Sequence, residues 1–377
     1  MDTRPSNPDH QHEQAPPEND WAPYVVWMKH APPMEFNLMG SNLLHCAVED
    51  LPGARDRLEL DGFHEEGYEP LLDAIASRAG LPTSRVALAT GASGANFLVG
   101  GALLRPGDEV LVERPVYDPL LGIPRFLGAR IKRFDRVFED GFQVDPDRVA
   151  RALSPDTRLI ILTNLHNPTG ALTSTDRLEA IGKVAAEVGA RVLVDEVYLE
   201  SVPGDPPPPA ATLSSTFIST SSLTKAYGLS GLRAGWILGS PEVVEACRRV
   251  RDLVDGVGAF PSELLALMAF ENLPGLRERA RAILDPNFQL LKGFIGGRPE
   301  LEWVEPQGGS VGFPRITGLE DSGPFVARLR ETYGTGVVPG HFFEAPPHFR
   351  VALGGKKEVL EGGLRRLGDA LDRELER

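Results

Sequence analysis

The sequence predicts an α/β protein with a large domain, built on a mostly parallel sheet flanked by helices, and a smaller α+β domain. Short, continuously apolar segments alternate with helical segments between about residues 86 and 238, which is typical of buried parallel strands. Long helical segments with few strand-like pieces follow residue 260. The 377 residues, 42% of them hydrophobic, suffice for two domains or for one large domain with an appendage.

The first 46 residues are expected to lie outside the large domain. Residues 1–20 are mainly proline, asparagine, aspartate, glutamine and histidine, which predicts a flexible N-terminal tail. Residues 21–46 bring aromatic side chains and the apolar segment Phe36-Asn37-Leu38-Met39. We expect this segment to form an N-terminal arm that packs with the small domain.

Residues 47–270 are predicted to form the large domain. Its first helix is expected at 68–79, where Gly80-Leu81-Pro82 ends it. Strands are expected at 86–89, 109–112, 159–163, 191–194, 217–220 and 234–238, and further helices at 95–104 and 174–188.

Residues 271–377 are predicted to form the small domain. Helical patterns cover 262–295, 322–332 and 356–375, and strand-like pieces occur around 301–315 and 349–353.

Charge and cysteine content exclude several classes of function. The net charge of −14 argues against nucleic acid or an anionic membrane as a partner. No run of about 18 apolar residues could span a bilayer. With only Cys46 and Cys247, we expect neither disulfides nor a metal site, which favours a cytoplasmic location.

Four of the predicted strand ends are unusually polar. In parallel α/β sheets, ligands bind beyond the carboxyl ends of the strands. The four polar segments are Thr90-Gly91-Ala92-Ser93-Gly94, Asn164-Leu165-His166-Asn167-Pro168-Thr169-Gly170, Asp195-Glu196-Val197-Tyr198 and Ser221-Ser222-Leu223-Thr224-Lys225. The glycines of the first segment open a helix whose free N–H groups suit a phosphate.

Lys225 stands in a nearly uncharged, Gly/Ser-rich stretch that also contains Arg233. A partly desolvated lysine has a lowered pKa and can form Schiff bases with carbonyl compounds. On this stretch alone, a structural lysine in a tight turn explains the pattern equally well.

Taken together, these segments resemble the class I/II aminotransferases, which are pyridoxal-phosphate-dependent enzymes of fold type I. The resemblance rests on Asn164-x-x-Asn167-Pro168-Thr169-Gly170, Asp195-x-x-Tyr198, Ser222-x-x-Lys225 and Arg233, in that order, and extends from about Gly40 to the C-terminus. It implies a sheet of the seven-stranded type in the large domain and pyridoxal 5'-phosphate as the cofactor.

The resemblance also implies roles for individual residues. Lys225 would bind the cofactor covalently and carry a proton, and Asp195 would pair with the ring nitrogen. Asn167 and Tyr198 would bind the ring oxygen. The phosphate would be held by a set of loop residues, namely Gly91, Ala92, Ser93, Ser222 and Arg233.

Three further positions match the family in the same way. Tyr117 matches an aromatic residue that stacks on the cofactor ring, and Arg350 matches the arginine that binds the substrate α-carboxylate. Gly40 matches a glycine near which the N-terminal segment covers the substrate.

Phe63 departs from the pattern, because many members carry there a tyrosine that reaches the neighbouring subunit's phosphate. No second arginine for a side-chain carboxylate is found.

Rival interpretations fit less well. The segment from Gly91 to Glu113 imitates a dinucleotide-binding unit, but its glycine fingerprint is incomplete. Ser222-x-x-Lys225 also matches the penicillin-binding proteins, but neither of their other motifs follows. A silent cofactor-sensing module beside a DNA-binding domain would need a longer N-terminal segment.

We therefore expect a homodimeric aminotransferase, with active sites at the subunit interface, that moves an amino group between an α-amino acid and a 2-oxo acid by a ping-pong mechanism. A β-eliminating C–S lyase or a related synthase of the same fold is the alternative. Sequence alone does not choose between them, because the bond that breaks depends on the orientation of the substrate against the ring.

Overall fold

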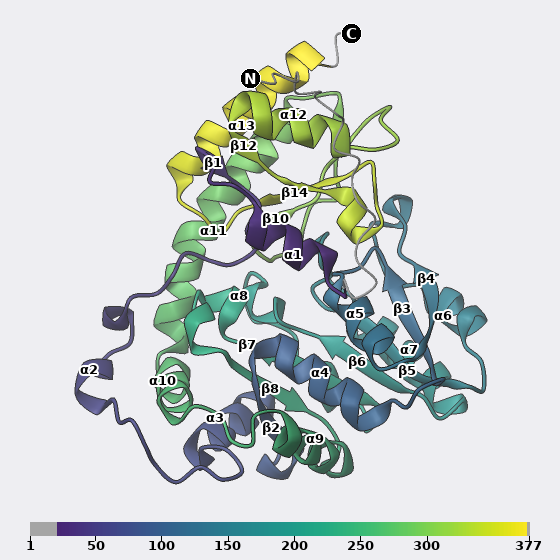
Figure 1. Cartoon of the computed structure of the whole chain (residues 1–377), viewed down its shortest axis with the longest axis vertical. Coiled ribbons are helices and arrows are strands. Elements are labelled where there is room, and N and C mark those ends of the chain that lie inside the picture. Colours follow the sequence, from purple (N-terminus) through teal and green to yellow (C-terminus); the bar gives the residue numbers. More distant parts are fainter. Residues whose placement is uncertain (1–20, 375–377) are drawn as a thin grey trace, which may run out of the picture.

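The computed structural model describes residues 21–374. Its helices and strands form two arrangements, a larger one and a smaller one, which lie one above the other in Figure 1. The tail predicted for residues 1–20 lies outside the described residues. No helix of the described part of the chain is long and apolar enough to cross a membrane.

The larger arrangement is built on a seven-stranded sheet with the strand order β2-β8-β7-β6-β5-β3-β4. Its strands, in chain order, are β2 (Val86–Thr90), β3 (Glu109–Arg114), β4 (Arg130–Asp135), β5 (Thr157–Thr163), β6 (Arg191–Asp195), β7 (Phe217–Ser222) and β8 (Ala234–Leu238). β8 runs antiparallel to both its neighbours, β2 and β7, whereas the other pairs are parallel. The predicted fold class is confirmed.

Helices cover both faces of this sheet. Apolar side chains of β2 and β8 point alternately to opposite faces, so that Ala87 and Ile237 belong to one core and Leu88 and Trp236 to the other. The first core is completed by α4 (Gly91–Leu103), α5 (Pro119–Phe126) and α9 (Pro241–Val254). The opposite face carries α3 (Glu69–Ala79), α6 (Pro146–Ala152), α7 (Thr175–Glu187) and α10 (Phe260–Glu271).

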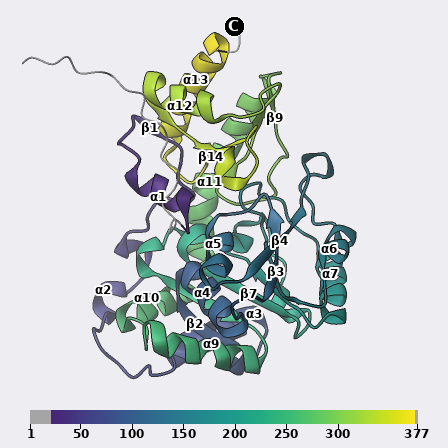
Figure 2. The ribbon, with the colours of Figure 1, turned by 45° about the vertical axis from the view of Figure 1, so that its right-hand side comes forward.

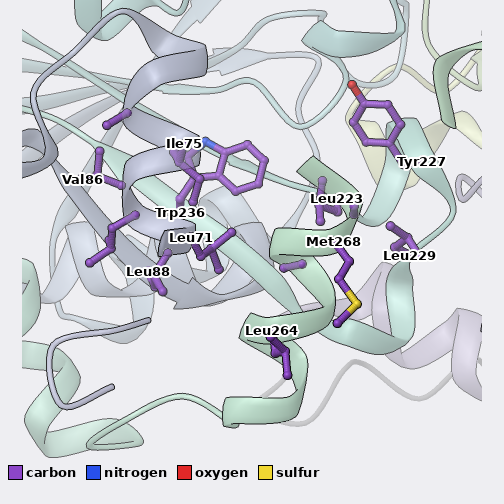
Figure 3. Packing of buried hydrophobic residues seen from close by; sticks show 14 of the residues in the cluster. Leu71, Ile75, Val86, Leu88, Leu223, Tyr227, Leu229, Trp236, Leu264 and Met268 are labelled. Carbon is purple, nitrogen blue, oxygen red and sulfur yellow. The ribbon is translucent and has the colours of Figure 1, made fainter. Parts of the chain in front are cut away.

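Figure 3 shows the second of these cores beside α3, where Leu71 and Ile75 lie close to Trp236. Leu223 and Tyr227, from the chain segment around Lys225, belong to the same cluster. Burial of these neighbours fixes the backbone of that segment, because each fully buried apolar side chain contributes about 1.5–3 kcal/mol.

The smaller arrangement combines long helices with short strands. Its helices are α11 (Leu273–Gly296), α12 (Gly323–Tyr333) and α13 (Lys357–Glu374), and its strands are β9 (Leu301–Glu302), β10 (Val311–Gly312), β11 (Arg315–Ile316), β12 (Thr335–Gly336), β13 (Val338–Pro339) and β14 (Phe349–Ala352). The predicted helical segment 262–295 is two helices, α10 and α11, which are separated at Asn272.

The N-terminal part of the described chain joins the two arrangements. Helix α1 (Pro23–His30) lies at the junction between them, as Figures 1 and 2 show. Strand β1 (Phe36–Asn37) pairs with β12 in parallel, and a short helix, α2 (Ala54–Arg57), follows along the outside of the larger arrangement.

Among the elements that the sequence analysis did not predict are the strands β1, β4, β12 and β13 and the helices α1, α2, α5, α6 and α9. Strand β4 lies at the edge of the sheet and reads Arg-Ile-Lys-Arg-Phe-Asp, with Phe134 as the one buried residue of the six, so it lacks the apolar run of the central strands. Helix α6 has a local signal, since Asp145 accepts a hydrogen bond from the Asp147 amide and Pro146 opens the helix.

Candidate active site

A cavity of about 400 Å³ lies at the carboxyl ends of β5, β6 and β7 and at the start of α4. Most of the predicted site residues line it, namely Ala92, Ser93, Tyr117, Asn167, Asp195, Tyr198, Ser222, Lys225 and Arg233. Gly91, Gly40 and Arg350 do not line the cavity. Val25 and Lys29 of α1 and Asn42 also contribute to its wall, and the sequence analysis did not name them.

Lys225 lies in the short helix α8 (Thr224–Tyr227), which follows β7. Its Nζ donates hydrogen bonds to Ser41 Oγ at 2.8 Å and to Asn42 Oδ1 at 2.7 Å. Desolvation and the positive charge of Arg350 lower the pKa of Lys225 to about 7, although Asp195 acts in the opposite direction. A large fraction of the amine is therefore neutral and nucleophilic near neutral pH.

The turn after Lys225 requires a glycine. Gly228 has a φ of +73°, and a Cβ at this position would lie 2.2 Å from the backbone oxygen of Leu44. The Gly228 oxygen accepts a hydrogen bond from the Cys46 amide at 3.2 Å. The chain that precedes Cys46, which includes Ser41 and Asn42, is thereby held against the lysine.

Asp195 ends β6 and is 5% exposed. Asn96 Nδ2 donates to its Oδ2 at 2.7 Å, and the Val197 amide donates to its Oδ1 at 3.1 Å. Burial raises the pKa of Asp195, while these two hydrogen bonds and Lys225 lower it. A buried carboxylate at this place is suited to hold a protonated ring nitrogen.

Asn96 is a residue that the sequence analysis missed. It is buried in α4, and its Oδ1 accepts a hydrogen bond from Thr220 Oγ1 at 2.6 Å, so its amide group can present only its nitrogen to Asp195. The available signal was one amide side chain within the apolar, glycine-rich helix 91–103.

A buried polar network of hydrogen bonds and one ion pair positions the backbone of Asn167. Its backbone amide donates to Thr163 Oγ1 at 3.0 Å, and this hydroxyl donates to Glu113 Oε1 at 2.6 Å. Glu113 is also paired with Arg136 at 2.8 Å, and both side chains are fully buried. The network satisfies the polar groups beneath the cavity.

The end of the cavity at α4 is suited to a phosphate. Arg233 donates only weakly to backbone oxygens, to Ser230 at 3.4 Å and to Thr90 at 3.5 Å, so its guanidinium retains donors for an anion. Gly91 opens α4 with a φ of +71°, and a Cβ there would lie 2.4 Å from Arg233 Nη2. A glycine at this position therefore lets the arginine lie against the helix N-terminus, where anions are favoured.

Arg233 reaches this edge because β8 is antiparallel. Ser222, at the end of β7, is paired with Gly235 near the beginning of β8, so the residues that enclose the Lys225 loop meet at one edge of the sheet. Gly235 also passes so close to Gly91 that a Cβ would lie 2.4 Å from its carbonyl carbon.

Arg350 lies in β14 and is fully buried. Its Nη1 donates to Asn167 Oδ1 at 3.3 Å, its Nη2 donates to Met39 O at 3.2 Å and to Tyr24 Oη, and its Nε has no hydrogen-bond partner. Within residues 21–374 no ion pair joins it to an acidic side chain. A buried guanidinium without a counter-charge is suited to bind a carboxylate.

The polar groups of this cavity fit pyridoxal phosphate. Lys225 offers an amine for its aldehyde, Asp195 a carboxylate for its ring nitrogen, and Arg233 with the start of α4 a positively charged site for its phosphate. Such a constellation on this fold defines a cofactor-dependent enzyme. In the part of the chain that the structure describes, no three His, Cys, Asp or Glu side chains gather as a metal site would need.

Comparison with known proteins identifies the family. The family model "aminotransferase class I and II" matches residues 41–367, so the chain belongs to this family of pyridoxal-phosphate-dependent enzymes. This confirms the resemblance that the sequence motifs predicted.

The individual relatives are named for different activities, a synthase among them as well as aminotransferases. Capreomycidine synthase of Streptomyces vinaceus is 32% identical over 81% of this chain and 79% of its own length. Arginine–pyruvate transaminase of Pseudomonas aeruginosa is 30% identical over 75% of this chain and 74% of its own length. The crystal structure of an aminotransferase from Streptococcus suis, 27% identical, superimposes with a TM-score of 0.87 over 95% of this chain and 98% of that one.

Proposed function

We propose that the protein is an aminotransferase that moves an amino group between an α-amino acid and a 2-oxo acid by a ping-pong mechanism. The observation that supports this most is the fully buried, uncompensated Arg350 beside Asn167, behind a cavity that contains Lys225 and Asp195. Both substrates of a transamination carry an α-carboxylate, so a single arginine can bind either of them in turn.

Each cavity residue has a proposed task. The cofactor, when bound, supplies a ring that accepts the electrons released at the substrate Cα. Lys225 would hold it covalently and, once released by the substrate amine, would move the Cα proton with its Nζ. Asp195 would keep the ring nitrogen protonated, and Asn167 and Tyr198 would bind the ring oxygen. The phosphate would be held by Ser222, Arg233 and the backbone around Gly91, Ala92 and Ser93.

Tyr117 and Gly40 have supporting parts in this proposal. Tyr117 lines the cavity and would stack on the cofactor ring. Gly40 precedes Ser41 and Asn42, the two residues that bind Lys225 Nζ, and would place the N-terminal arm beside the substrate.

The first test uses the cofactor itself. Purified protein is expected to be yellow, and Lys225→Ala is expected to abolish the absorbance band of the covalently bound cofactor. Mixing the holoenzyme with each amino acid in turn should convert this band to that of the amino form and release the matching 2-oxo acid. An unaltered band in Lys225→Ala would refute the assignment of the lysine.

A second candidate, a synthase that rearranges its amino acid and retains the amino group, is favoured by one finding. The 32% identity with capreomycidine synthase is higher than the 30% identity with arginine–pyruvate transaminase. The half-reaction screen separates the two functions, because a synthase consumes its amino acid without leaving the cofactor in the amino form. Pyruvate and ammonia among the products would instead indicate the C–S lyase.

We also propose that the protein is a homodimer. Large apolar side chains are exposed on two neighbouring segments, Leu60 and Phe63 on one and Leu253 and Val257 on the other, with exposed fractions between 45% and 87%. His64 Nε2 lies 3.0 Å from the Gly258 oxygen, which joins the two segments. Exposed large apolar side chains on neighbouring segments are typical of an interface. Sedimentation should give a dimer, and Phe63→Asp should weaken it.

Domain limits and location are further proposals. Residues 47–270 would form the cofactor-binding domain and 271–377 the small domain, whose helices share a separate core with Leu38 of the N-terminal arm. Cys46 and Cys247 are free thiols, which is compatible with a cytoplasmic location.

A further inference from the structure

Helix α1 carries one buried side chain, Tyr24, which is 5% exposed. Its ring centroid lies 5.6 Å from that of Phe343 and 5.9 Å from that of Tyr117. Its backbone amide donates to Asp118 Oδ2 at 2.8 Å. Tyr24 therefore joins α1 to both arrangements, since Phe343 follows β13 and Tyr117 follows β3.

The hydroxyl of Tyr24 contacts Nη2 of Arg350. A guanidinium can only donate hydrogen bonds, so the phenol oxygen accepts this one. The hydroxyl proton of Tyr24 consequently remains available to a second acceptor beside the arginine. The guanidinium carbon of Arg350 also lies 5.0 Å from the Tyr24 ring centroid, which keeps the two groups in contact.

An anion is the acceptor that this arrangement lacks. Arg350 has an unpartnered Nε and only neutral oxygens around its other nitrogens, those of Tyr24, Met39 and Asn167. A carboxylate bound at Nη2 of Arg350 would lie beside the phenol oxygen that contacts the same nitrogen. Two charge-assisted hydrogen bonds to one carboxylate are stronger and more specific than a single one.

We propose that Tyr24 is a substrate-binding residue that donates a hydrogen bond to the α-carboxylate held by Arg350. The inference rests on the proposed binding of an α-amino acid at Arg350. It also makes α1 responsive to substrate, because an isolated helix of this length is marginal in water and depends on docking. The carboxylate adds a contact on Tyr24 and so holds in place Val25 and Lys29, which line the cavity.

The experiment compares holoenzyme variants Tyr24→Phe and Tyr333→Phe, since Tyr333 lies at the end of α12 and packs, partly buried, against a core that does not include Tyr24. L-Aspartate, L-arginine and ethylamine are titrated against the cofactor absorbance of each variant. Ethylamine has the reacting amine but no carboxylate. Tyr24→Phe removes one charge-assisted hydrogen bond, so the dissociation constants of both amino acids should rise by the same factor, about 10- to 100-fold.

The controls separate binding from a general disturbance. Ethylamine should change by less than about twofold, and Tyr333→Phe should behave like the wild type. Hydrogen exchange of the amides of residues 23–30 should slow when an amino acid binds to the wild type, and this slowing should be reduced in Tyr24→Phe.

Several results would overturn the inference. They are unchanged amino-acid affinity in Tyr24→Phe, equal weakening of ethylamine, or an effect on L-aspartate without the same effect on L-arginine. The test does not depend on the reaction that follows binding. If the amino acids are consumed without release of their matching 2-oxo acids, transamination is refuted, while the ratio between Tyr24→Phe and wild-type affinity still decides the role of Tyr24.

Discussion

The titration of Lys225 in the protein without cofactor tests the electrostatics of the site most directly. Desolvation and Arg350 lower the pKa of this lysine from 10.5 to about 7. The neutral amine is the form present above the pKa. At pH 7 about half of the Lys225 amines are then neutral, against roughly one in 3,000 for a lysine of ordinary pKa.

Competitive acetylation measures this property at one residue. The apoenzyme is pulsed with a limiting amount of acetic anhydride across the range from about pH 5 to 11, together with a free reference amine, and the Lys225 peptide is quantified by mass spectrometry. Labelling of Lys225 should rise with pH and level off above about pH 8, because only the neutral amine reacts. The reference amine should continue to gain reactivity up to its own pKa.

Two variants give opposite expectations and serve as matched controls. Arg350→Ala removes a positive charge and should raise the midpoint, whereas Asp195→Asn removes a negative charge and should lower it. A wild-type midpoint above about pH 9.5, close to that of a free lysine, would refute the reasoning. So would a shift of both variants in the same direction.

Three further predictions concern the carboxylates and the substrate arginine. Asp195→Asn should still bind pyridoxal phosphate but lose nearly all transfer rate, because a neutral amide cannot keep the ring nitrogen protonated; unchanged turnover in a single-turnover assay would contradict this. Arg350→Ala should raise the Michaelis constants of the amino acid and the oxo acid together, by about 30-fold or more if the lost interaction is worth at least about 2 kcal/mol. Steady-state kinetics with both substrates measures this, and an effect on only one of them would contradict the prediction. Glu113→Ala should lower the free energy of unfolding by about 3–5 kcal/mol, since it leaves Arg136 as a buried, unpaired charge. The exposed pair Lys292–Glu305 provides the control for denaturant unfolding, because Glu305→Ala should cost no more than about 1 kcal/mol.

The central strands could be predicted because each is a short apolar run buried on both faces. Residues 191–195 illustrate this, with four of the five strand residues fully enclosed. Strand β4 could not be predicted in this way, because it lies at the edge of the sheet and only one of its six residues, Phe134, is buried. The antiparallel direction of β8 could not be predicted from its residues either, since parallel and antiparallel strands of five residues have similar sequences.

The candidate site was predicted only as far as its residues lie in recognisable strand-end motifs. Asn167, Asp195, Lys225 and Arg233 were named from such motifs, and the cavity brings all four together. Asn96 was missed although it contacts Asp195, because 99 positions separate the two residues in the chain. Tyr24 was missed for the same reason, being 326 positions from Arg350.

The sequence by itself determined the fold class, the family and the chemical types of side chain at the strand ends, because these depend on local apolar runs and on ordered motifs. Only the tertiary structure decided which groups act on each other. The pKa of Lys225 depends on Arg350, on Asp195 and on the loss of water. The Tyr24 hydroxyl can donate its proton to a further acceptor because its oxygen already accepts a hydrogen bond from Arg350, which lies on a strand distant in the sequence. Electrostatic interactions and hydrogen bonds fall off over a few ångströms in space, whatever the separation along the chain.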